Sequence, residues 1–178
     1  MSEILIVYAT TDGHTFDIAL RIRQLSEQQG HRVTMASIRD EANINLNLFD
    51  KIVVGASIRY GKHGVQVYRF VKKYQGILEN KQSAFFSVNL VARKPEKSQP
   101  ETNPYVQKFL KQIQWVPQEL AVFAGKLDYP RYRFWDRQMI RLIMWMTKGP
   151  TTPQAVIDFT DWKQVEAFGL LVGKMKNV

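Results

Sequence analysis

Short apolar runs alternate with longer amphipathic stretches along most of this chain. The runs are rich in β-branched residues and cover Ile4 to Tyr8, Val33 to Ser37, Lys51 to Ala56, Ser83 to Val88 and Ala121 to Ala124. Continuous apolar runs of this kind are typical of parallel strands that are buried on both faces of a sheet. Five of them predict a doubly wound α/β fold with strand order 2-1-3-4-5, in which ligands bind beyond the carboxyl ends of the strands.

The stretches between these runs carry apolar residues at helical spacing. Helices are predicted around Ile18, Ile22 and Leu25; Val67, Phe70, Val71 and Tyr74; Val106, Phe109, Leu110 and Ile113; and Trp162, Val165 and Val172. The second connection, Asn43 to Leu48, has only a weak helical pattern, and Arg93 to Pro104 is interpreted as a long loop. We expect Val156 to Phe159 to resume the last strand and Thr160 to cap the final helix.

Length and composition agree with one globular unit. With 178 residues, 45% hydrophobic and 23% charged, residues 1–178 are expected to form a single domain. The absence of cysteine excludes disulfides, thiolate metal sites and cysteine nucleophiles, and suits a reducing compartment. The first apolar run lacks a basic n-region and is too short for a signal peptide or a membrane span. A net charge of +9 predicts attraction to a polyanion, an anionic lipid surface or a multiply anionic small molecule.

The turn after the first strand has the residues of a phosphate site. In Thr10-Thr11-Asp12-Gly13-His14-Thr15 a helix follows the strand at once, so hydroxyl and backbone N–H groups point to one spot. A helix N-terminus carries about half a positive charge and attracts anions, and Gly13 allows a close approach. The turn lacks the Gly-Lys-Ser/Thr of a P-loop and the three glycines of a dinucleotide fold, which disfavours ATP and NAD. The structural alternative is that Thr15 merely caps the helix and the preceding threonines form a polar turn.

Two further segments are expected at the same edge of the sheet. Gly55 to Gly61 follows the third strand, and Ser87 to Leu90 follows the fourth. Both offer backbone amides and carbonyls to a flat heterocycle. Tyr60 is a candidate to stack on it, with plain packing of that ring as an equal alternative.

These three segments resemble the loops with which flavodoxins bind the phosphate and the two sides of the isoalloxazine ring of FMN. The resemblance implies a flavodoxin-like fold with FMN as the cofactor. The cofactor-binding residues that it implies are Thr10, Thr11, Asp12, Gly13, His14, Thr15, Ser57, Ile58, Arg59, Tyr60, Gly61, Ser87, Val88, Asn89 and Leu90. Asp12 departs from the threonine usual in electron-carrier flavodoxins, and an acid so near a phosphate must point away or be offset by a positive charge.

An insertion at about residues 126–152 interrupts the alternation with arginine and aromatic residues. Between Lys126 and Lys148, basic residues outnumber acidic ones by six to two. From Phe134 to Met146 the spacing predicts a short basic amphipathic helix with Arg137 and Arg141 one turn apart. Its apolar face is predicted to consist of Met139, Ile143 and Met146.

The function of this helix has three interpretations. It can lie in a membrane interface with Trp135 and Trp145 at the boundary, although it is too short and too often interrupted by arginine to span. Alternatively, its apolar face packs on the protein core and its arginines are solvated. The arginines can also pair with carboxylates of a small substrate. The candidates for contact with substrate or lipid are Arg131, Arg133, Arg137 and Arg141.

Several longer segments resemble the bacterial menaquinone-dependent protoporphyrinogen oxidase family. They are Gly55 to Gly61, Ser87 to Pro95, Tyr129 to Arg133 and Met139 to Met144, and the resemblance extends over essentially the whole chain. It implies a peripheral flavoprotein on the cytoplasmic face of the inner membrane that converts protoporphyrinogen IX to protoporphyrin IX in haem biosynthesis. FMN would take hydride equivalents in three two-electron steps and pass the electrons to menaquinone or another quinone.

Other functions fit less well. An NAD(P)H-dependent quinone reductase is the alternative enzyme, and an electron-carrier flavodoxin is the alternative binding module, although carriers tend to present acidic surfaces. No nucleic-acid motif accompanies the positive charge, and a phosphorylated receiver domain would need an acidic pair where Ala9 and Thr10 stand. The sequence leaves open the proton acceptor, the preferred quinone and the oligomeric state, a homo-oligomer included.

The three histidines and the acids do not form a metal motif. No cluster of His, Asp and Glu has the spacing of metal ligands, and His14 and His31 have no partner pattern. His63, with Arg59 and Lys62, lies near the predicted flavin edge, but a histidine in such a position is more often solvated than catalytic.

Overall fold

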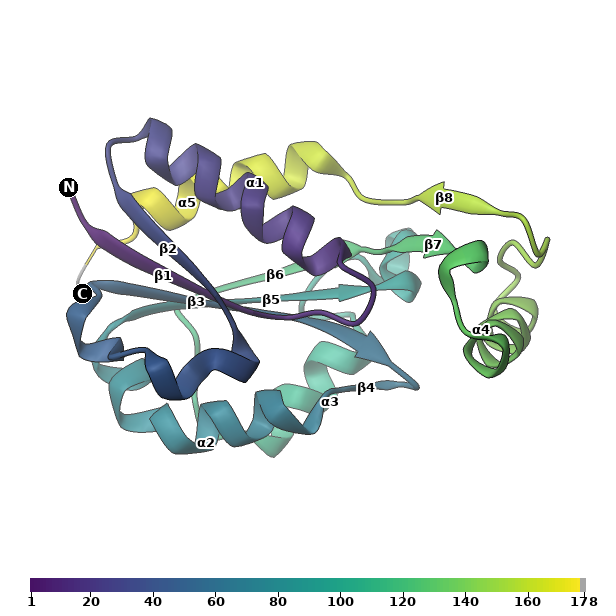
Figure 1. The fold of residues 1–178 in the computed structure, drawn as a ribbon, viewed down its shortest axis with the longest axis horizontal. Helices are drawn as coiled ribbons and strands as arrows, with labels where there is room; N and C mark the ends of the chain where they lie inside the picture. Colours follow the sequence, from purple (N-terminus) through teal and green to yellow (C-terminus); the bar gives the residue numbers. More distant parts are fainter. Residues whose placement is uncertain (177–178) are drawn as a thin grey trace.

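The computed structural model describes residues 1–176 and contains a parallel sheet with helices on both faces (Figure 1). The long strands are β1 (Glu3–Ala9), β2 (Arg32–Ser37), β3 (Lys51–Arg59), β5 (Gln82–Asn89) and β6 (Glu119–Ala124). All of them pair in parallel, in the order β2-β1-β3-β5-β6. Numbered among themselves these strands have the predicted order 2-1-3-4-5, so the doubly wound fold is confirmed.

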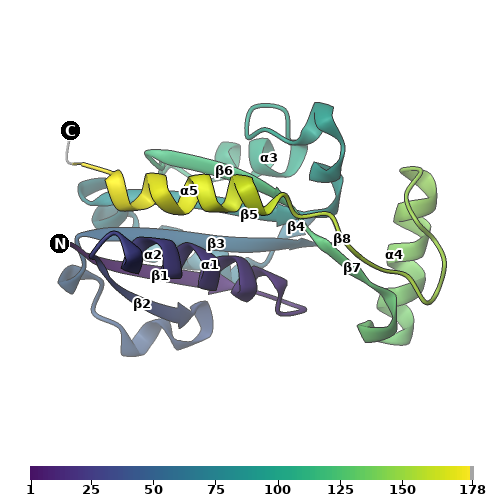
Figure 2. The same cartoon turned by 90° about the horizontal axis from the view of Figure 1, so that it is seen from above.

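Two pairs of helices cover the sheet. On one face lie α1 (His14–Gln28) and α5 (Trp162–Lys174), and on the other α2 (Val65–Asn80) and α3 (Pro104–Gln112) (Figures 1 and 2). These are the four helices that the apolar spacing predicts. The weakly helical connection forms only 3-10 turns, η1 (Ile38–Asn43) and η2 (Leu46–Leu48), and the long loop after β5 holds η3 (Leu90–Arg93) and η4 (Pro95–Lys97).

The sheet divides the core into two halves because side chains alternate across a strand. In β1, Ile4 and Ile6 pack with the residues of α1 and α5, whereas Leu5 and Val7 pack with those of α2 and α3. All four side chains are fully buried. Burial on both faces explains why the strand runs in the sequence are apolar without interruption.

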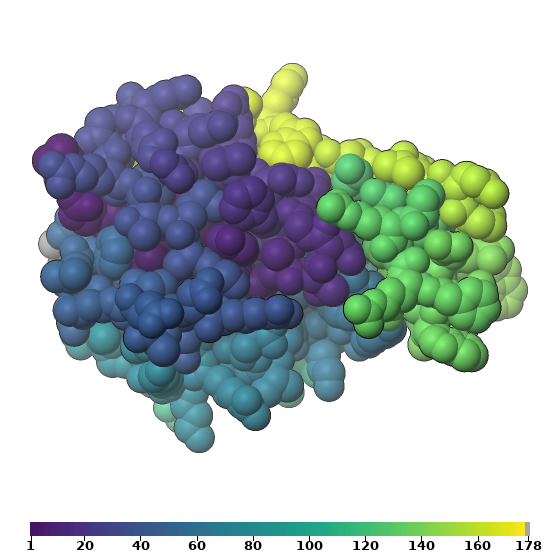
Figure 3. Space-filling model, in the orientation of Figure 1, coloured from purple at the N-terminus to yellow at the C-terminus, as the bar shows by residue number. Residues whose placement is uncertain are grey.

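The insertion stands out beyond the carboxyl ends of the strands (Figures 2 and 3). It contains β7 (Lys126–Asp128), η5 (Tyr129–Arg131), α4 (Phe134–Met146) and β8 (Val156–Asp158). β7 and β8 pair antiparallel as a two-stranded ribbon. A core of its own, separate from the two halves above, joins Leu127, Tyr129, Tyr132, Ile140 and Met144. The bounds of α4 are those that the spacing predicts.

Two predictions for the end of the chain are wrong. Val156 to Phe159 does not resume the last strand of the large sheet, because β8 pairs with β7 instead. Thr160 does not cap α5. The cap is Asp161, whose carboxylate accepts hydrogen bonds from two backbone N–H groups of the first turn. Thr160 instead donates its hydroxyl hydrogen to the carbonyl oxygen of Ala124, at 2.8 Å.

Candidate functional site

A cleft lies where the carboxyl ends of β1, β3 and β5 meet the insertion. Twelve of the predicted cofactor-binding residues line it: Thr10, Thr11, Asp12, His14, Thr15, Ser57, Ile58, Arg59, Tyr60, Val88, Asn89 and Leu90. Three segments that are distant in the sequence therefore meet in space, as a doubly wound sheet requires. The other predicted residues, Gly13, Gly61 and Ser87, are not part of the lining.

The N-terminus of α1 faces this cleft without a side-chain cap. Gly13 is the N-cap residue and has φ of +91°, a left-handed conformation that strains any other residue. Its backbone N–H donates to the hydroxyl of Thr10 at 2.9 Å, which closes the turn. Within the described residues, no side chain accepts from the first backbone N–H groups of the helix. These groups are therefore available to an anionic ligand.

The hydroxyl of Thr15 is a buried polar group without a partner. Thr15 is 1% exposed, and its Oγ1 makes no hydrogen bond within residues 1–176. Leaving such a group unsatisfied costs about 1–3 kcal/mol. Because Thr15 lies in the first turn of α1 and lines the cleft, a bound anion would satisfy it. The alternative that Thr15 merely caps the helix is wrong, since Gly13 is the cap.

The negative charge of Asp12 is offset by Arg59. The Nη2 atom of Arg59 lies 2.6 Å from Oδ2 of Asp12, and the guanidinium lies over the ring of Tyr132, 5.5 Å from its centroid. The expectation that an acid in this turn needs a compensating charge is therefore met. The Nη1 atom of Arg59 is buried and has no partner among the described residues.

Tyr60 lies at the tip of a tight hairpin that sequence analysis did not predict. The end of β3 pairs antiparallel with β4 (Lys62–His63), and Tyr60 and Gly61 between them have φ of +52° and +76°. Two consecutive left-handed residues are typical of a two-residue hairpin turn. The strain at Tyr60 costs about 1–2 kcal/mol. Its hydroxyl donates to the carboxylate of Asp136 in α4, which joins the hairpin to the insertion.

Beneath the cleft, a network of hydrogen bonds joins four buried polar side chains. The Nε2 atom of His63 lies 2.9 Å from Oγ of Ser87, to which the amide of Asn89 donates at 3.2 Å. Asn89 also pairs with Asn103, the N-cap of α3. His63 is 1% exposed, and burial lowers its pKa to about 4. The interpretation of His63 as a solvated loop residue is therefore wrong.

The imidazole of His14 contacts residues at the C-terminal end of the insertion and at the start of α5. Its Nε2 atom lies 2.6 Å from Oγ1 of Thr160 and 3.6 Å from a carboxylate oxygen of Asp158, and its ring packs edge-on against Trp162. Burial lowers the pKa of His14, although Asp158 acts in the opposite direction. Since the imidazole is engaged in this way, the contribution of His14 to an anion site is its backbone N–H.

Two of the four candidate arginines hold the insertion together. Arg137 donates from Nε to the carbonyl oxygen of Tyr129 at 3.0 Å and from Nη2 to that of Tyr132 at 3.3 Å. Arg141 donates from Nε to the carbonyl oxygen of Thr151 at 2.9 Å. The interpretation of the arginine face as solvated is wrong for these two residues.

Arg131 and Arg133 differ from the other two candidate arginines. Both are exposed, and neither side chain makes a hydrogen bond or ion pair in the described part of the chain. They remain candidates for contact with substrate or lipid.

The apolar face of α4 is turned to solvent. The helix buries Ile140 and Met144 instead of the predicted Met139 and Met146, which are exposed, and Ile143 is half-buried. The interpretation that this face packs on the core is therefore wrong. The exposed apolar residues of α4, named here the outer face, are Phe134, Trp135, Met139, Leu142, Trp145 and Met146.

Comparison with known proteins agrees with this geometry. The flavodoxin domain family matches residues 5–154. A protoporphyrinogen IX dehydrogenase (quinone) of Escherichia coli K12 is 45% identical over 166 residues, which cover 93% of this chain and 92% of the relative. One of Leishmania major is 45% identical over 167 residues, which cover 93% of this chain and 72% of the relative.

The chain belongs to the protoporphyrinogen IX dehydrogenase (quinone) family.

Solved structures agree on the fold of this family member. Flavodoxin 1 of Bacillus cereus has a TM-score of 0.59 at 16% identity, with 99% of this chain and 100% of that one covered. Two-electron reduced flavodoxin of Megasphaera elsdenii has a TM-score of 0.58 at 13% identity, with 97% and 99% covered. At these identities the likeness shows the fold alone, which is that of flavodoxin.

Four further residues line the cleft of this dehydrogenase family member without having been predicted: Gly125, Lys126, Tyr132 and Ile140. Tyr132 lies within the motif Tyr129 to Arg133. In that motif the arginines, but not the aromatic residues, are predicted from the sequence as candidates for ligand contact. Its hydroxyl accepts from the backbone N–H of Asp128 at 3.2 Å, which orients the ring. No periodic signal in the sequence places Ile140 beside a turn so distant along the chain.

Residues 1–176 contain neither a cluster of metal-ligating side chains nor a helix that could span a membrane. No group of three or more His, Asp and Glu side chains lies close enough to hold a metal ion. No helix in this range combines the length and the apolar character needed to cross a bilayer.

Proposed function

We propose that this chain uses FMN to oxidise protoporphyrinogen IX to protoporphyrin IX and passes the electrons to menaquinone or another quinone, in haem biosynthesis. It is an oxidoreductase of the family identified above. One observation carries the proposal: a cleft made of three flavodoxin-type segments occurs in a chain that is 45% identical, over 93% of its length, to a dehydrogenase of this name.

The residues of the cleft fit FMN. The uncapped start of α1, the unpartnered hydroxyl of Thr15 and the hydroxyls of Thr10 and Thr11 would hold the phosphate. The nearest acid, Asp12, is already paired with Arg59. The residues Ser57 to Tyr60 and Val88 to Leu90, which line the cleft, would frame the ring. When bound, FMN supplies the two-electron chemistry that links the macrocycle to the quinone.

The chain itself supplies orientation and shielding. Tyr132 and Ile140 form the wall of the cleft on the insertion side, and Tyr60 closes the hairpin side. The contact between Tyr60 and Asp136 holds these two walls together. Apolar and aromatic walls exclude water from a reduced macrocycle, which protects it from side reactions.

We further propose that the outer face of α4 lies in the interface of the inner membrane, on its cytoplasmic side. Trp135 and Trp145 are 78% and 70% exposed, and tryptophan favours the boundary between headgroups and acyl chains. The exposed Arg131 and Arg133 and the net charge of +9 would be attracted to anionic headgroups. A cleft beside this helix would give an apolar quinone a short route from the lipid.

Anaerobic turnover tests the proposed reaction. Chain loaded with FMN is mixed with protoporphyrinogen IX and menaquinone, and porphyrin fluorescence is followed. Fluorescence is expected to rise only when chain, FMN and quinone are all present. Purified chain that binds no FMN would refute the cofactor, and FMN-loaded chain that leaves protoporphyrinogen unchanged would refute the substrate. Rapid oxidation of NAD(P)H by the loaded chain would favour the quinone reductase instead.

A further inference from the structure

A second cavity adjoins the predicted flavin cleft on the side of α2. The two share Thr10, Thr11, Ser57, Arg59 and Tyr60, so a molecule that fills one lies against the other. The remaining wall is formed by the end of β1, by β4 and by the first residues of α2. The residues that line this second cavity but not the flavin cleft are not among the predicted cofactor-binding residues.

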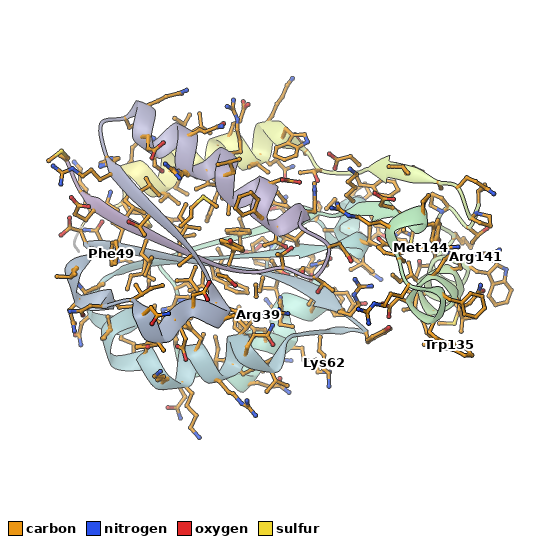
Figure 4. All side chains as sticks on the ribbon, in the orientation of Figure 1. Arg39, Phe49, Lys62, Trp135, Arg141 and Met144 are labelled. Atoms are coloured by element: carbon orange, nitrogen blue, oxygen red, sulfur yellow. The ribbon has the colours of Figure 1, made fainter. Side chains whose placement is uncertain are left out.

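The wall of the second cavity carries positive charge and no acid. Arg59 and Lys62 both line it, and no Asp or Glu of the described chain does. Asp12, the ion-pair partner of Arg59, lines only the flavin cleft. Lys62 is exposed, has no ion-pair partner within residues 1–176, and projects from the hairpin on the α2 side (Figure 4). An anion in this cavity would therefore meet the unpaired charge of Lys62 and the guanidinium of Arg59, whose charge Asp12 partly offsets from the side of the flavin cleft.

Arg59 is oriented for a ligand with a planar anionic group. Its Nη2 atom is held by Asp12, and its guanidinium lies over Tyr132, so the group has a fixed position. Its Nη1 atom is buried without a partner in the described residues. A buried guanidinium nitrogen without an acceptor is costly, and a carboxylate would satisfy it.

The floor of the cavity adds further donors. The N-cap of α2 is Gly64, and no side chain among residues 1–176 caps the start of this helix. His63, which also lines the cavity, is fixed by its bond to Ser87. Uncapped backbone N–H groups beside two cations favour an anion.

We propose that this second cavity binds a carboxylate of the tetrapyrrole substrate while the macrocycle lies against the flavin cleft. This inference rests on the proposed function and deepens it. It moves the principal carboxylate contact from the insertion to the β3–β4 hairpin, since Arg137 and Arg141 are committed to backbone carbonyls. The phosphate of a pyridine nucleotide has related chemistry and is the competing source of the anion.

Equilibrium binding tests this inference independently of turnover. FMN-loaded chain is titrated with protoporphyrin IX and with its dimethyl ester, which lacks the negative charges. The wild type is expected to bind the free acid about tenfold more tightly than the ester, as a charge-assisted contact predicts. Lys62→Gln is expected to lose most of this preference while its affinity for the ester stays unchanged. Lys72→Gln, on the exposed face of α2 outside the cavity, is the matched control and should keep it.

The outcomes separate this inference from the proposed function. Equal affinity of the wild type for acid and ester would overturn the carboxylate site, and so would an equal loss for both ligands in Lys62→Gln. A third overturning result is that Lys62→Gln raises the KM for NADPH but keeps the preference for the acid, because the anion would then be a phosphate. Acid preference without porphyrinogen oxidation would instead contradict the proposed function and leave the binding site supported.

Discussion

Thr15 carries the most direct evidence for an anion at the start of α1. Its hydroxyl is buried and unpartnered, so Thr15→Val removes nothing that the free chain uses. We expect this variant to bind FMN at least about tenfold more weakly, the value of a hydrogen bond to a charged group, without loss of stability. Quenching of flavin fluorescence measures the affinity. Riboflavin, which has no phosphate, should bind both proteins equally.

Ser26 provides the matched control, because its hydroxyl is also buried and unpartnered on α1 but does not line the cleft. Ser26→Ala should leave the affinity for FMN unchanged. An unaltered affinity in Thr15→Val, or an equal loss for riboflavin, would count against a phosphate at this position.

His63 makes the stability of the fold depend on pH. Burial lowers its pKa from 6.5 to about 4 in the folded chain, so the unfolded chain binds more protons between these values. Above pH 6.5 His63 is neutral in both the folded and the unfolded chain, so it does not lower the free energy of unfolding. As the pH falls from 6.5 toward 4, only the unfolded chain takes up the proton, and the free energy of unfolding decreases. The free energy of unfolding should therefore drop by about 2 kcal/mol between pH 7 and pH 5 because of this residue.

Urea unfolding at the two pH values measures this drop in stability. In His63→Gln most of the drop should disappear, whereas His31→Gln, which changes a histidine outside the cleft, should keep most of it. A wild type whose stability is the same at pH 7 and pH 5 would contradict a buried neutral His63.

Helix α4 has the bounds that its apolar spacing predicts, but not the orientation. Spacing identifies a face; it does not determine whether that face meets the core or the solvent. Here Arg137 and Arg141 turn toward the loops around them, where each donates to backbone carbonyl groups. Carbonyl groups in irregular segments need donors from outside regular secondary structure, and a guanidinium group supplies several.

Arg137 is accordingly predicted to stabilise the insertion. Arg137→Met removes two donors from the carbonyls of Tyr129 and Tyr132, so residues 129–146 should exchange amide hydrogen about tenfold faster, as the loss of about 1.4 kcal/mol of local stability implies. Exchange mass spectrometry measures this. Arg133→Met, at the exposed start of the same helix, is the control and should exchange as the wild type does.

The outer face of α4 is predicted to mediate binding to lipid. Replacing both Trp135 and Trp145 with Glu should reduce binding to anionic vesicles by about tenfold or more, since two interfacial aromatic residues are lost and two negative charges are added. Vesicle flotation measures the bound fraction. The control is Val116→Glu, which changes a side chain that is 81% exposed in the loop before β6. This variant should bind the vesicles as the wild type does. Equal binding by all three proteins would refute docking through α4.

For the molecule as a whole, the sequence predicts those features of the fold that depend on the periodic burial of apolar side chains. The strand order, the four helices around the sheet and the meeting of three segments at one edge all follow from side chains buried on both faces of the strands. The two-stranded ribbon of β7 and β8 does not follow from this pattern. Each strand has only three residues, and the two strands are separated in the sequence by the rest of the insertion.

Contacts between distant residues also lie beyond the sequence pattern. The pairing of Asp12 with Arg59 could be anticipated as a need for positive charge, but the partner could not be named. The contributions of Tyr132 and Ile140 to the cleft depend on how the insertion folds back over the sheet, which no local signal specifies.

The central claim is that the start of α1 holds the phosphate of a flavin mononucleotide. A crystal structure of the chain grown with FMN tests it directly. We expect the phosphate to lie within hydrogen-bonding distance of the Thr15 hydroxyl and the first backbone N–H groups of α1, with the ring between Tyr60 and the segment 87–90. FMN bound elsewhere, or a phosphate that makes no contact with α1, would contradict the claim.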